Sequence, residues 1–327
     1  MKNRVVIVGC GKIAGLFDDK DGGHVSFSHA QAYLNHGYFE LVGCVDSSAE
    51  RAELFSSKYS VPYFGSNLHD VLEATAADVV SITTPDETHC QIALEVLQYR
   101  PATRLIFLEK PACKTHEELE KLLRAAKISN IPVVVNHSRR FHPLYKNIKN
   151  KYESEFFGEL IQVDGHYYGG WIHNGVHLVD LMRFLFSSEF NDFQVIELLE
   201  NNLVQDPTLT VRAEFGPNKI PIYFHGWTDK HYQVFDVEFR FTKGRLQVNN
   251  FESKVIWEEK VVNHLGESVL QNSDEKSWFE GYSAISSAIS VIAEYLDEGE
   301  RAILRGVQLT DICPTMSSLW KVTQLTK

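Results

Sequence analysis

The stretch VVIVGCGKIAG, residues 5–15, decides the fold class of this chain. Four apolar β-branched residues form a short run, Gly9 and Gly11 follow it directly, and Ala14 comes three residues later. In this pattern the first glycine permits a tight turn, the second lets a pyrophosphate approach the backbone, and the alanine lets a following helix pack closely on the strand. The stretch therefore predicts a strand, a phosphate-binding turn and a helix whose N-terminus faces the phosphates. The expected cofactor contacts in this turn are Gly9, Gly11, Lys12, Ile13 and Ala14.

A carboxylate ends the second apolar run and predicts which dinucleotide is bound. Asp46 closes ELVGCVD, at the position where an acidic side chain grips the ribose hydroxyls of NAD. The same charge would repel the 2'-phosphate of NADP, and the adjacent Ser47 and Ser48 supply no cation. We therefore expect NAD, with Asp46 and Ser47 as contacts, while Arg51 keeps NADP open as the alternative.

The stretch between Gly11 and Asp46 is longer than the roughly 20 residues of the usual fingerprint. An insertion is therefore expected, and the polar, glycine-containing segment LFDDKDGGHVSFS, residues 16–28, stands where the first helix would otherwise run. Long loops in compact domains are either functional or merely variable. Both a surface loop and a lid near the cofactor remain open for this segment.

The rhythm of the sequence changes near residue 140. Before it, short β-branched runs alternate with amphipathic stretches, which predicts a parallel sheet wound by right-handed crossovers. After it, longer alternating strands follow one another with little helix between them, which predicts a large, mostly antiparallel open sheet. We expect an α/β chain with an N-terminal Rossmann NAD(P)-binding domain over residues 1–140. A C-terminal α+β domain for substrate binding and oligomerisation is expected over 141–327, with helices in residues 172–186 and 282–299.

Composition excludes several classes of partner. A net charge of -11 repels nucleic acid, and no Lys/Arg cluster longer than a pair offsets it. No apolar run approaches the roughly 20 residues that span a bilayer, so no membrane association is expected. The start MKNRVVIVGCG fits a first strand better than a signal peptide. The five scattered cysteines fit reduced thiols, and we place the protein in the cytoplasm.

Five motifs appear in a fixed order along nearly the whole chain. They are GCGKIA (9–14), TTPDETH (83–89), LEKPACKT (108–115), SRRFHP (138–143) and NGVHLVDL (174–181). With these motifs the chain resembles the glucose-fructose oxidoreductase, inositol dehydrogenase and MocA (Gfo/Idh/MocA) family. The resemblance implies a Thr-Pro turn under the cofactor, a Glu-Lys-Pro turn beside the nicotinamide, and a lysine that binds the reacting oxygen. The cofactor contacts it implies are Thr83, Thr84, Pro85, His89, Glu109 and Lys110.

The segment IHNGVHLVD carries the largest departure from that family. The usual pattern is Asp-x-Gly-x-His-x-x-Asp, which Gly175, His177 and Asp180 match, whereas His173 replaces the first aspartate. Oxidation of a secondary alcohol needs a base as well as a hydride acceptor, and a lysine with a histidine can supply it. We expect Lys110 and His177 to be catalytic, Asp180 to orient the base or touch substrate, and His173 either to partner the base or to serve only the helix entry.

Several further residues are candidates for substrate contact. Arg139 and Arg140 suit bidentate recognition of a carboxylate or phosphate, and equally suit bracing of the two domains. The aromatic residues Tyr167, Tyr168, Trp171, Trp227 and Tyr232 fit core or interface positions, with Tyr168 and Trp171 as exceptions that face substrate. The expected substrate contacts are Lys110, Arg140, Tyr168, Trp171, Asn174 and His177. No metal site is expected, because no second ligand cluster accompanies the two histidines.

The sequence predicts an NAD(P)-dependent oxidoreductase that acts on a ring hydroxyl or carbonyl of a sugar, cyclitol or nucleotide-activated sugar. One alternative is an NAD-assisted glycoside hydrolase or lyase, in which transient oxidation of the sugar acidifies a neighbouring C–H bond. Another alternative is a non-catalytic cofactor-binding sensor, which the replacement at His173 keeps open. A homodimer or homotetramer is expected, because the open sheet needs a cover on its second face.

Overall fold

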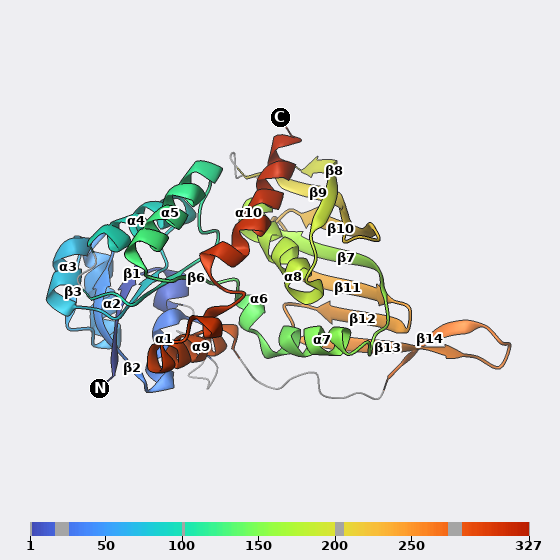
Figure 1. Ribbon diagram of the computed structural model, residues 1–327, viewed down its shortest axis with the longest axis horizontal. Helices are drawn as coiled ribbons and strands as arrows, with labels where there is room; N and C mark the ends of the chain where they lie inside the picture. Colours follow the sequence, from blue (N-terminus) through green and yellow to red (C-terminus); the bar gives the residue numbers. More distant parts are fainter. Residues whose placement is uncertain (1, 17–25, 100–101, 200–205, 274–282, 327) are drawn as a thin grey trace. The chain divides into compact units, whose positions relative to one another are not determined.

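The computed structural model describes residues 2–16, 26–99, 102–199, 206–273 and 283–326 (Figure 1). The contacts divide the chain into two compact units, Met1–Pro143 with Gly281–Cys313, and Leu144–Glu280 with Pro314–Lys327. The first boundary lies close to the expected one at residue 140. The second differs from expectation, because a C-terminal segment that we assigned to the second domain returns to the first unit.

The first unit contains a six-stranded, all-parallel sheet with strand order β3-β2-β1-β4-β5-β6. The strands are β1 Asn3–Val8, β2 Phe39–Val45, β3 Tyr63–Gly65, β4 Val79–Ile82, β5 Leu105–Leu108 and β6 Val133–Val135. The order reverses between β1 and β4, and ligands bind at such a switch point, outside the carboxyl ends of the strands. The glycine turn follows β1 at this point, so the predicted Rossmann architecture is confirmed.

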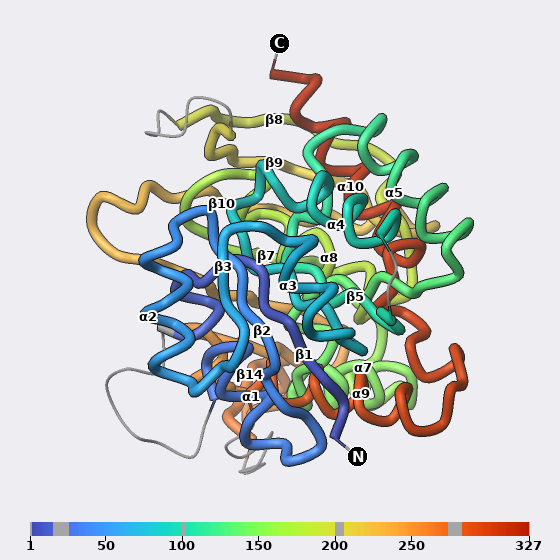
Figure 2. Tube along the Cα trace, turned by 90° about the vertical axis from the view of Figure 1, so that its left-hand side faces the viewer, coloured from blue at the N-terminus to red at the C-terminus, as the bar shows by residue number. Residues whose placement is uncertain are grey.

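Helices flank this sheet, and Figure 2 shows α2 and α3 beside β1 to β3. They are η1 Lys12–Leu16, α1 His29–His36, α2 Ala49–Tyr59, α3 Leu68–Thr75, η2 Asp86–Thr88, α4 His89–Tyr99, α5 His116–Ser129, α6 Ser138–Phe141, α9 Ala284–Glu298 and η4 Arg301–Leu304. Local sequence sets several of their ends. Thr115 and Glu118 form a capping box at α5, and the Ser48 side chain accepts from the Arg51 amide at the start of α2.

Helix α9 forms where the sequence predicted a helix, but it packs in the other unit. Its buried residues Ile285, Ala288, Ile289 and Ile292 join the core cluster that also contains Tyr33 of α1. An apolar stripe at helical spacing shows that a helix has a face to bury. It does not show which sheet receives that face, so the expected membership in the second domain is wrong.

The second unit contains an eight-stranded sheet with strand order β14-β13-β12-β11-β7-β10-β9-β8. The strands are β7 Leu160–Tyr168, β8 Phe190–Leu199, β9 Thr208–Phe215, β10 Ile220–Trp227, β11 Phe235–Phe241, β12 Gly244–Asn249, β13 Lys254–Val262 and β14 Ser268–Asn272. Only β7 and β10 pair in parallel, and the other neighbours are antiparallel. The predicted open, mostly antiparallel sheet is therefore confirmed.

One face of the second sheet carries the core of this unit. Its helices are α7 Pro143–Glu153, η3 Trp171–Gly175, α8 Val176–Phe186 and, from Pro314 onward, α10 Leu309–Gln324 (Figure 1). A Cβ on Gly165 of β7 would lie 3.0 Å from Leu178, so α8 rests closely on the strand. The opposite face presents partly exposed side chains of β10, such as Tyr223, His225 and Trp227.

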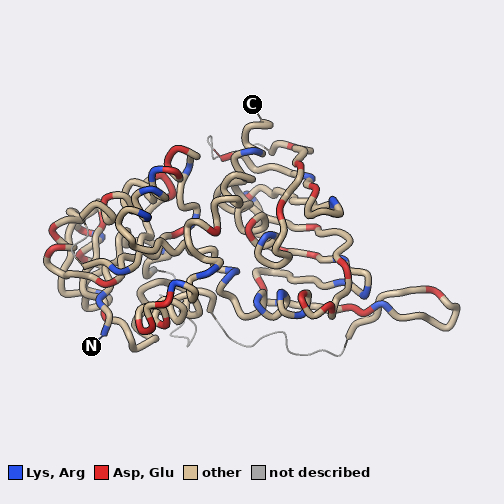
Figure 3. Tube along the Cα trace, viewed as in Figure 1, with Lys and Arg blue, Asp and Glu red and all other residues tan. Residues whose placement is uncertain are grey.

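Charged side chains are mixed along the described chain. Figure 3 shows lysines and arginines interspersed with aspartates and glutamates, as in the cluster where Arg245 pairs with Glu238 and Glu258 on β11 to β13. Among the described helices, none has both the length and the apolar character that a bilayer crossing requires.

Candidate functional site

The glycine turn after β1 leaves open space where a pyrophosphate would approach. Gly9 has a φ of 93°, and a Cβ on it would lie 2.8 Å from the backbone carbon and oxygen of Thr83. The Thr83 hydroxyl donates to the Gly9 carbonyl at 2.7 Å, which ties the turn to the end of β4. A Cβ on Gly11, by contrast, would meet no described heavy atom within 4 Å. The two glycines therefore serve the different purposes that the pattern predicts, tight turn and open approach.

The helix that follows the turn is short. It is a five-residue π-helix, Lys12–Leu16, and the α-helix α1 begins only at His29, where Ser28 caps it. Ala14 is buried as predicted. The expected insertion, residues 16–28, thus separates the turn from α1, and its residues 17–25 lie outside the described part of the chain. A short helix thus follows the turn as predicted, and the position of the phosphates at its N-terminus stays a prediction.

Asp46 at the end of β2 is buried, and backbone groups fix its carboxylate. Its Oδ2 accepts from the Cys10 amide at 2.9 Å, and its Oδ1 accepts from the Ser48 amide at 2.9 Å. The first turn of α2 brings Arg51 Nη1 to 3.4 Å from Oδ1, and this arginine side chain is 56% exposed. The arginine that keeps NADP open as the alternative therefore lies beside Asp46. Ser47 is exposed, as a ribose contact requires.

The turn after β4 contains a histidine that is buried beneath it. His89, the first residue of α4, places Nε2 2.7 Å from the Thr84 carbonyl oxygen and Nδ1 2.8 Å from the Pro111 carbonyl oxygen. Only 1% of His89 is exposed, so the expected direct contact with cofactor is wrong. The ring instead joins the turns after β4 and β5. Thr84 is partly exposed and Pro85 exposed at the carboxyl edge of the sheet, where the prediction placed them.

Glu109, after β5, is the centre of a buried network that the sequence did not suggest. His29 of α1 contacts Glu109 Oε1 through Nε2 at 2.8 Å and Ser81 Oγ through Nδ1 at 2.7 Å. The Asn136 amide donates to the same Glu109 oxygen at 2.6 Å. These residue types also make a hydrolytic triad, but Ser81 has no exposed surface and cannot attack a substrate. The network is therefore structural.

The carboxyl of Glu109 stays ionised although it is buried. Burial on its own raises the pKa of this group, but the hydrogen bond and charge of His29, the Asn136 amide and the Lys110 ammonium outweigh that effect. The pKa of Glu109 consequently lies below its ordinary value. Glu109 Oε2 also accepts from the backbone amide of Lys110 at 3.3 Å. Lys110 itself is partly exposed at the carboxyl edge of β5.

The histidine segment of the second unit begins in a π-helix. Trp171–Gly175 forms η3, and the regular helix α8 starts at Val176. His173 is exposed and His177 partly exposed, and the His177 ring lies 6.3 Å from that of Phe235. The two histidines therefore belong to helices of different pitch, His173 to η3 and His177 to α8. Both remain accessible within their own unit.

Asp206, which the sequence did not single out, fixes the start of this segment. Its carboxylate accepts from the amides of Ile172 at 2.7 Å and His173 at 2.8 Å, in the manner of an N-terminal cap. Gly170 is required beside it, since a Cβ there would lie 1.9 Å from the Asp206 carboxylate. No local sequence pattern predicts this contact, because Asp206 is far along the chain from Ile172 and His173.

We expect Asp206→Ala to lower the free energy of unfolding by about 0.5–2 kcal/mol, because the amides of Ile172 and His173 lose the acceptor that caps the start of η3. Urea denaturation measures the loss. Asp192→Ala is the matched control, because the Asp192 side chain is 73% exposed and should leave stability nearly unchanged. Equal stability of both variants would contradict the capping role.

Three expected contacts in this segment are contradicted by burial. Trp171 has no exposed surface and its Nε1 donates to the Leu319 carbonyl at 3.2 Å, so it belongs to the core. Asn174 is buried beneath Gly169. Asp180 is buried and accepts from the Thr315 hydroxyl at 2.9 Å, which joins α8 to α10 and favours a structural role over substrate contact. Helical periodicity in the sequence does not distinguish residues that are buried in the core from residues that contact a substrate.

Arg140 and Tyr168 have different outcomes. Arg140 is buried, and its Nη1 donates to the Gly306 carbonyl at 2.6 Å inside the first unit. That bond and the burial hold Arg140 within the first unit, so the expected substrate contact of Arg140 is wrong. Tyr168 is partly exposed at the end of β7, with its ring 6.2 Å from that of Phe251. Tyr167, its neighbour, is core, as predicted for most of these aromatic residues.

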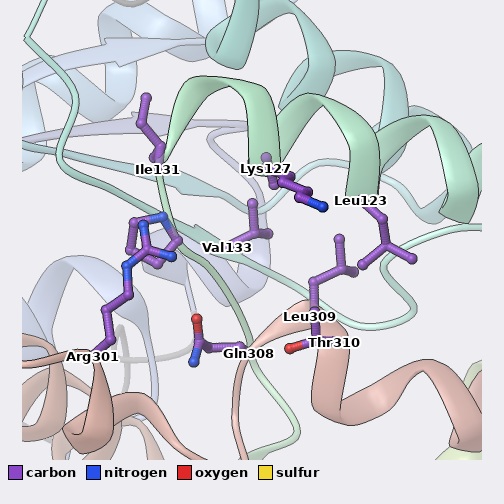
Figure 4. A pocket seen from close by; sticks show the side chains of 10 residues that line it. Leu123, Lys127, Ile131, Val133, Arg301, Gln308, Leu309 and Thr310 are labelled. Atoms are coloured by element: carbon purple, nitrogen blue, oxygen red, sulfur yellow. The ribbon is translucent and has the colours of Figure 1, made fainter.

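A pocket of about 290 Å³ on the first unit lies away from the glycine turn. Figure 4 shows Leu123 and Lys127 of α5 together with Arg301, Leu309 and Thr310. The pocket also contains Pro132 and Val133, which stand at the amino end of β6. Since the strands are parallel, this is the end opposite to the glycine turn, and the pocket is not the cofactor site. Across the residues that the structure describes, no group of three or more His, Cys, Asp or Glu is placed to hold a metal ion.

Comparison with known proteins supports the Rossmann fold of the first unit. Residues 3–137 match the Gfo/Idh/MocA oxidoreductase family, described by its NAD-binding Rossmann fold, which confirms the resemblance over this part of the chain. Inositol 2-dehydrogenase from Salmonella typhimurium is 26% identical over 188 residues, which are 53% of this chain and 55% of that protein. The chain spans about half the length of the curated relatives it matches.

Solved structures extend the likeness to nearly the full length. UDP-N-acetylglucosamine 3-dehydrogenase GnnA from Acidithiobacillus ferrooxidans has a TM-score of 0.77 at 17% identity, covering 98% of this chain and 96% of that one. A super-repressor mutant of Gal80p from Saccharomyces cerevisiae has a TM-score of 0.76 at 15% identity, covering 100% and 97%. At these identities the likeness shows the fold alone.

Proposed function

We propose, from the match of residues 3–137 to the Gfo/Idh/MocA oxidoreductase family with its NAD-binding Rossmann fold, that this chain is an NAD-dependent dehydrogenase. Its substrate would be a sugar, cyclitol or nucleotide-activated sugar with a ring hydroxyl or carbonyl. The observation that carries the proposal is the carboxyl edge of the first sheet. There the open turn at Gly11, the fixed carboxylate of Asp46 and the accessible Lys110 belong to one unit.

The residues present fit a dinucleotide. Gly11 leaves room for a pyrophosphate, Asp46 suits ribose hydroxyls, and the turns of Thr84 and Lys110 border the same edge of the sheet. Bound NAD would supply the hydride acceptor. Further contacts are proposed for the exposed or partly exposed Lys12, Ile13, Ser47 and Pro85.

Two side chains are proposed to act on the substrate. Lys110 would bind the reacting oxygen and stabilise the negative charge that develops on it when its proton leaves. His177 would take that proton in the oxidation and return it in the reduction, because an imidazole exchanges protons near neutral pH. His173 and Tyr168, both accessible in the second unit, are proposed as substrate contacts.

The test is an absorbance scan at the reduced-nicotinamide band with NAD and a panel of sugars, cyclitols and nucleotide sugars. Turnover by the wild type that is lost in Lys110→Ala and in His177→Ala supports the dehydrogenase. Tight NAD binding without a net absorbance change would favour the redox-assisted hydrolase or lyase, which product analysis of glycosides then detects. Absence of any chemistry would favour a sensor, the class that the His173 replacement keeps open.

We expect the wild type to bind NAD at least tenfold more tightly than NADP, because the Asp46 carboxylate repels a 2'-phosphate. Asp46→Ala should weaken NAD binding about tenfold, or about 1.4 kcal/mol, and improve NADP binding, since Arg51 loses its carboxylate partner and can pair with phosphate. Fluorescence titration measures both dissociation constants. In Asp46→Ala/Arg51→Ala the gain for NADP should vanish. Equal affinity of the wild type for both dinucleotides would contradict the assignment.

The environment and assembly are also proposed. None of the five cysteines forms a disulfide, and four are buried, which suits the reducing cytoplasm. The open face of the second sheet, where Trp227 is 46% exposed, is proposed as the contact of a homodimer or homotetramer. Sedimentation of the intact protein tests the assembly, and a monomer at all concentrations would contradict it.

A further inference from the structure

We infer that two buried histidines, His29 and His89, are the positioning residues of Lys110. The inference rests on the proposed function, in which Lys110 binds the reacting oxygen. Neither histidine offers a surface to substrate, since His29 is 0% and His89 1% exposed. Each instead holds a residue that flanks Lys110, one on its N-terminal side and the other on its C-terminal side.

On the N-terminal side, His29 holds Glu109. The ionised carboxylate only accepts hydrogen bonds, so His29 Nε2 carries the hydrogen in its 2.8 Å contact with Glu109 Oε1. His29 Nδ1 lies 2.7 Å from the Ser81 hydroxyl oxygen, which can donate to the ring or accept from it. With its second oxygen, Glu109 accepts from the backbone amide of Lys110 at 3.3 Å. The histidine thus acts on Lys110 through one carboxylate.

On the C-terminal side, His89 holds Pro111. Its Nδ1 lies 2.8 Å from the Pro111 carbonyl oxygen and its Nε2 lies 2.7 Å from the Thr84 carbonyl oxygen. Carbonyl oxygens only accept, so both contacts are satisfied together only when both ring nitrogens carry hydrogen. The ring thereby joins the turn of Lys110 to the turn after β4.

These contacts fix the position of Lys110, which a catalytic lysine requires. Lys110 has a long flexible side chain, and a misplacement of about 1 Å costs as much as 10²-fold in rate. Its backbone is therefore fixed from both sides by groups that are buried and protected from water. Asn136 adds a third strand end to the network through Glu109.

Substitution of each histidine by asparagine or glutamine tests its two ring nitrogens one at a time. The asparagine side chain places an N–H donor near the position of Nδ1, and the glutamine side chain places one near the position of Nε2. His29→Gln keeps the contact with Glu109, and His89→Asn keeps the contact with Pro111. His29→Asn keeps only Ser81, and His89→Gln keeps only Thr84. If the histidines position Lys110, the first pair should retain kcat within about threefold and the second pair should lose at least tenfold.

A readout without turnover distinguishes failure of this inference from failure of the proposed function. Hydrogen exchange of the peptide around Lys110, and acylation of the Lys110 amine followed by mass spectrometry, both report its placement in the cofactor-free protein. Faster exchange and altered acylation are expected in His29→Asn and His89→Gln, and wild-type behaviour in the other pair. His116→Gln is the control, because the His116 side chain is 69% exposed on α5.

Two results would overturn the inference. One is equal exchange and acylation in all four variants. The other is a loss of kcat that correlates with the fall in melting temperature and does not depend on which ring nitrogen the substitution replaces. A histidine that only stabilises the fold would give that result. The wild type could lack dehydrogenase activity while hydrogen exchange is faster in His29→Asn and His89→Gln than in the other two variants. In that case the positioning of Lys110 holds and the proposed function fails.

Discussion

Lys110→Ala is expected to lower kcat for sugar or cyclitol oxidation by about 10³-fold, within the range that loss of a group stabilising the charge on the reacting oxygen costs. The Kd of NAD should change by less than about threefold. The physical reason is that other residues, and not the Lys110 side chain, hold the backbone of this turn. Glu109 and Pro111 are held through buried histidines, so the turn keeps its shape when the accessible side chain of Lys110 is removed.

The control lies on the same turn. Lys114 pairs with Glu87 at 3.2 Å and is partly exposed, so Lys114→Ala removes a neighbouring positive charge without touching the proposed chemistry. It should retain kcat within about twofold. Lys110→Arg should recover little activity, because the planar guanidinium differs in shape and reach from the compact ammonium that binds the reacting oxygen. Unchanged kcat in Lys110→Ala, with tight NAD binding retained, would contradict the assignment of Lys110.

Gly9→Ala is expected to weaken NAD binding by at least 10²-fold and to lower the melting temperature of the protein. At a φ of 93° a side chain is strained, which costs about 1–3 kcal/mol. The added Cβ would also lie 2.8 Å from the Thr83 backbone, so the turn or the end of β4 must move. Because Thr83 donates to the Gly9 carbonyl, the displacement reaches the loop in which Gly11 admits the pyrophosphate. Isothermal titration and thermal unfolding measure the two effects.

Gly37→Ala separates strain from the clash. Gly37 caps α1 with a φ of 73°, but a Cβ there would meet nothing within 4 Å among the described residues. It should lose stability, by about 2–4 °C per kcal/mol for a unit of this size, and bind NAD normally. Comparable NAD affinities of Gly9→Ala and Gly37→Ala would show that the glycine turn does not serve the cofactor.

Local sequence was enough to predict the edge of the first sheet that carries the site. Short β-branched runs predict strands, and a glycine turn or carboxylate that directly follows such a run must lie at its carboxyl end. Since parallel strands bring these ends to one edge, the meeting of the glycine turn, Asp46 and Lys110 there follows without any knowledge of packing. A different pattern, longer alternating strands with little helix between them, predicted the open antiparallel sheet of the second unit.

The sequence by itself therefore determined the fold class and the placement of the glycine turn, Asp46 and Lys110 at one edge of the first sheet. Only the tertiary structure decided that His29 and His89 hold the residues flanking Lys110, that Asp206 caps the segment of His173, that Trp171 is core, and that α9 belongs to the first unit. These outcomes depend on pairs of residues far apart in the chain. Periodicity tells that a side chain faces inward, but the partner it meets is set by which faces pack together, and no local pattern encodes that choice.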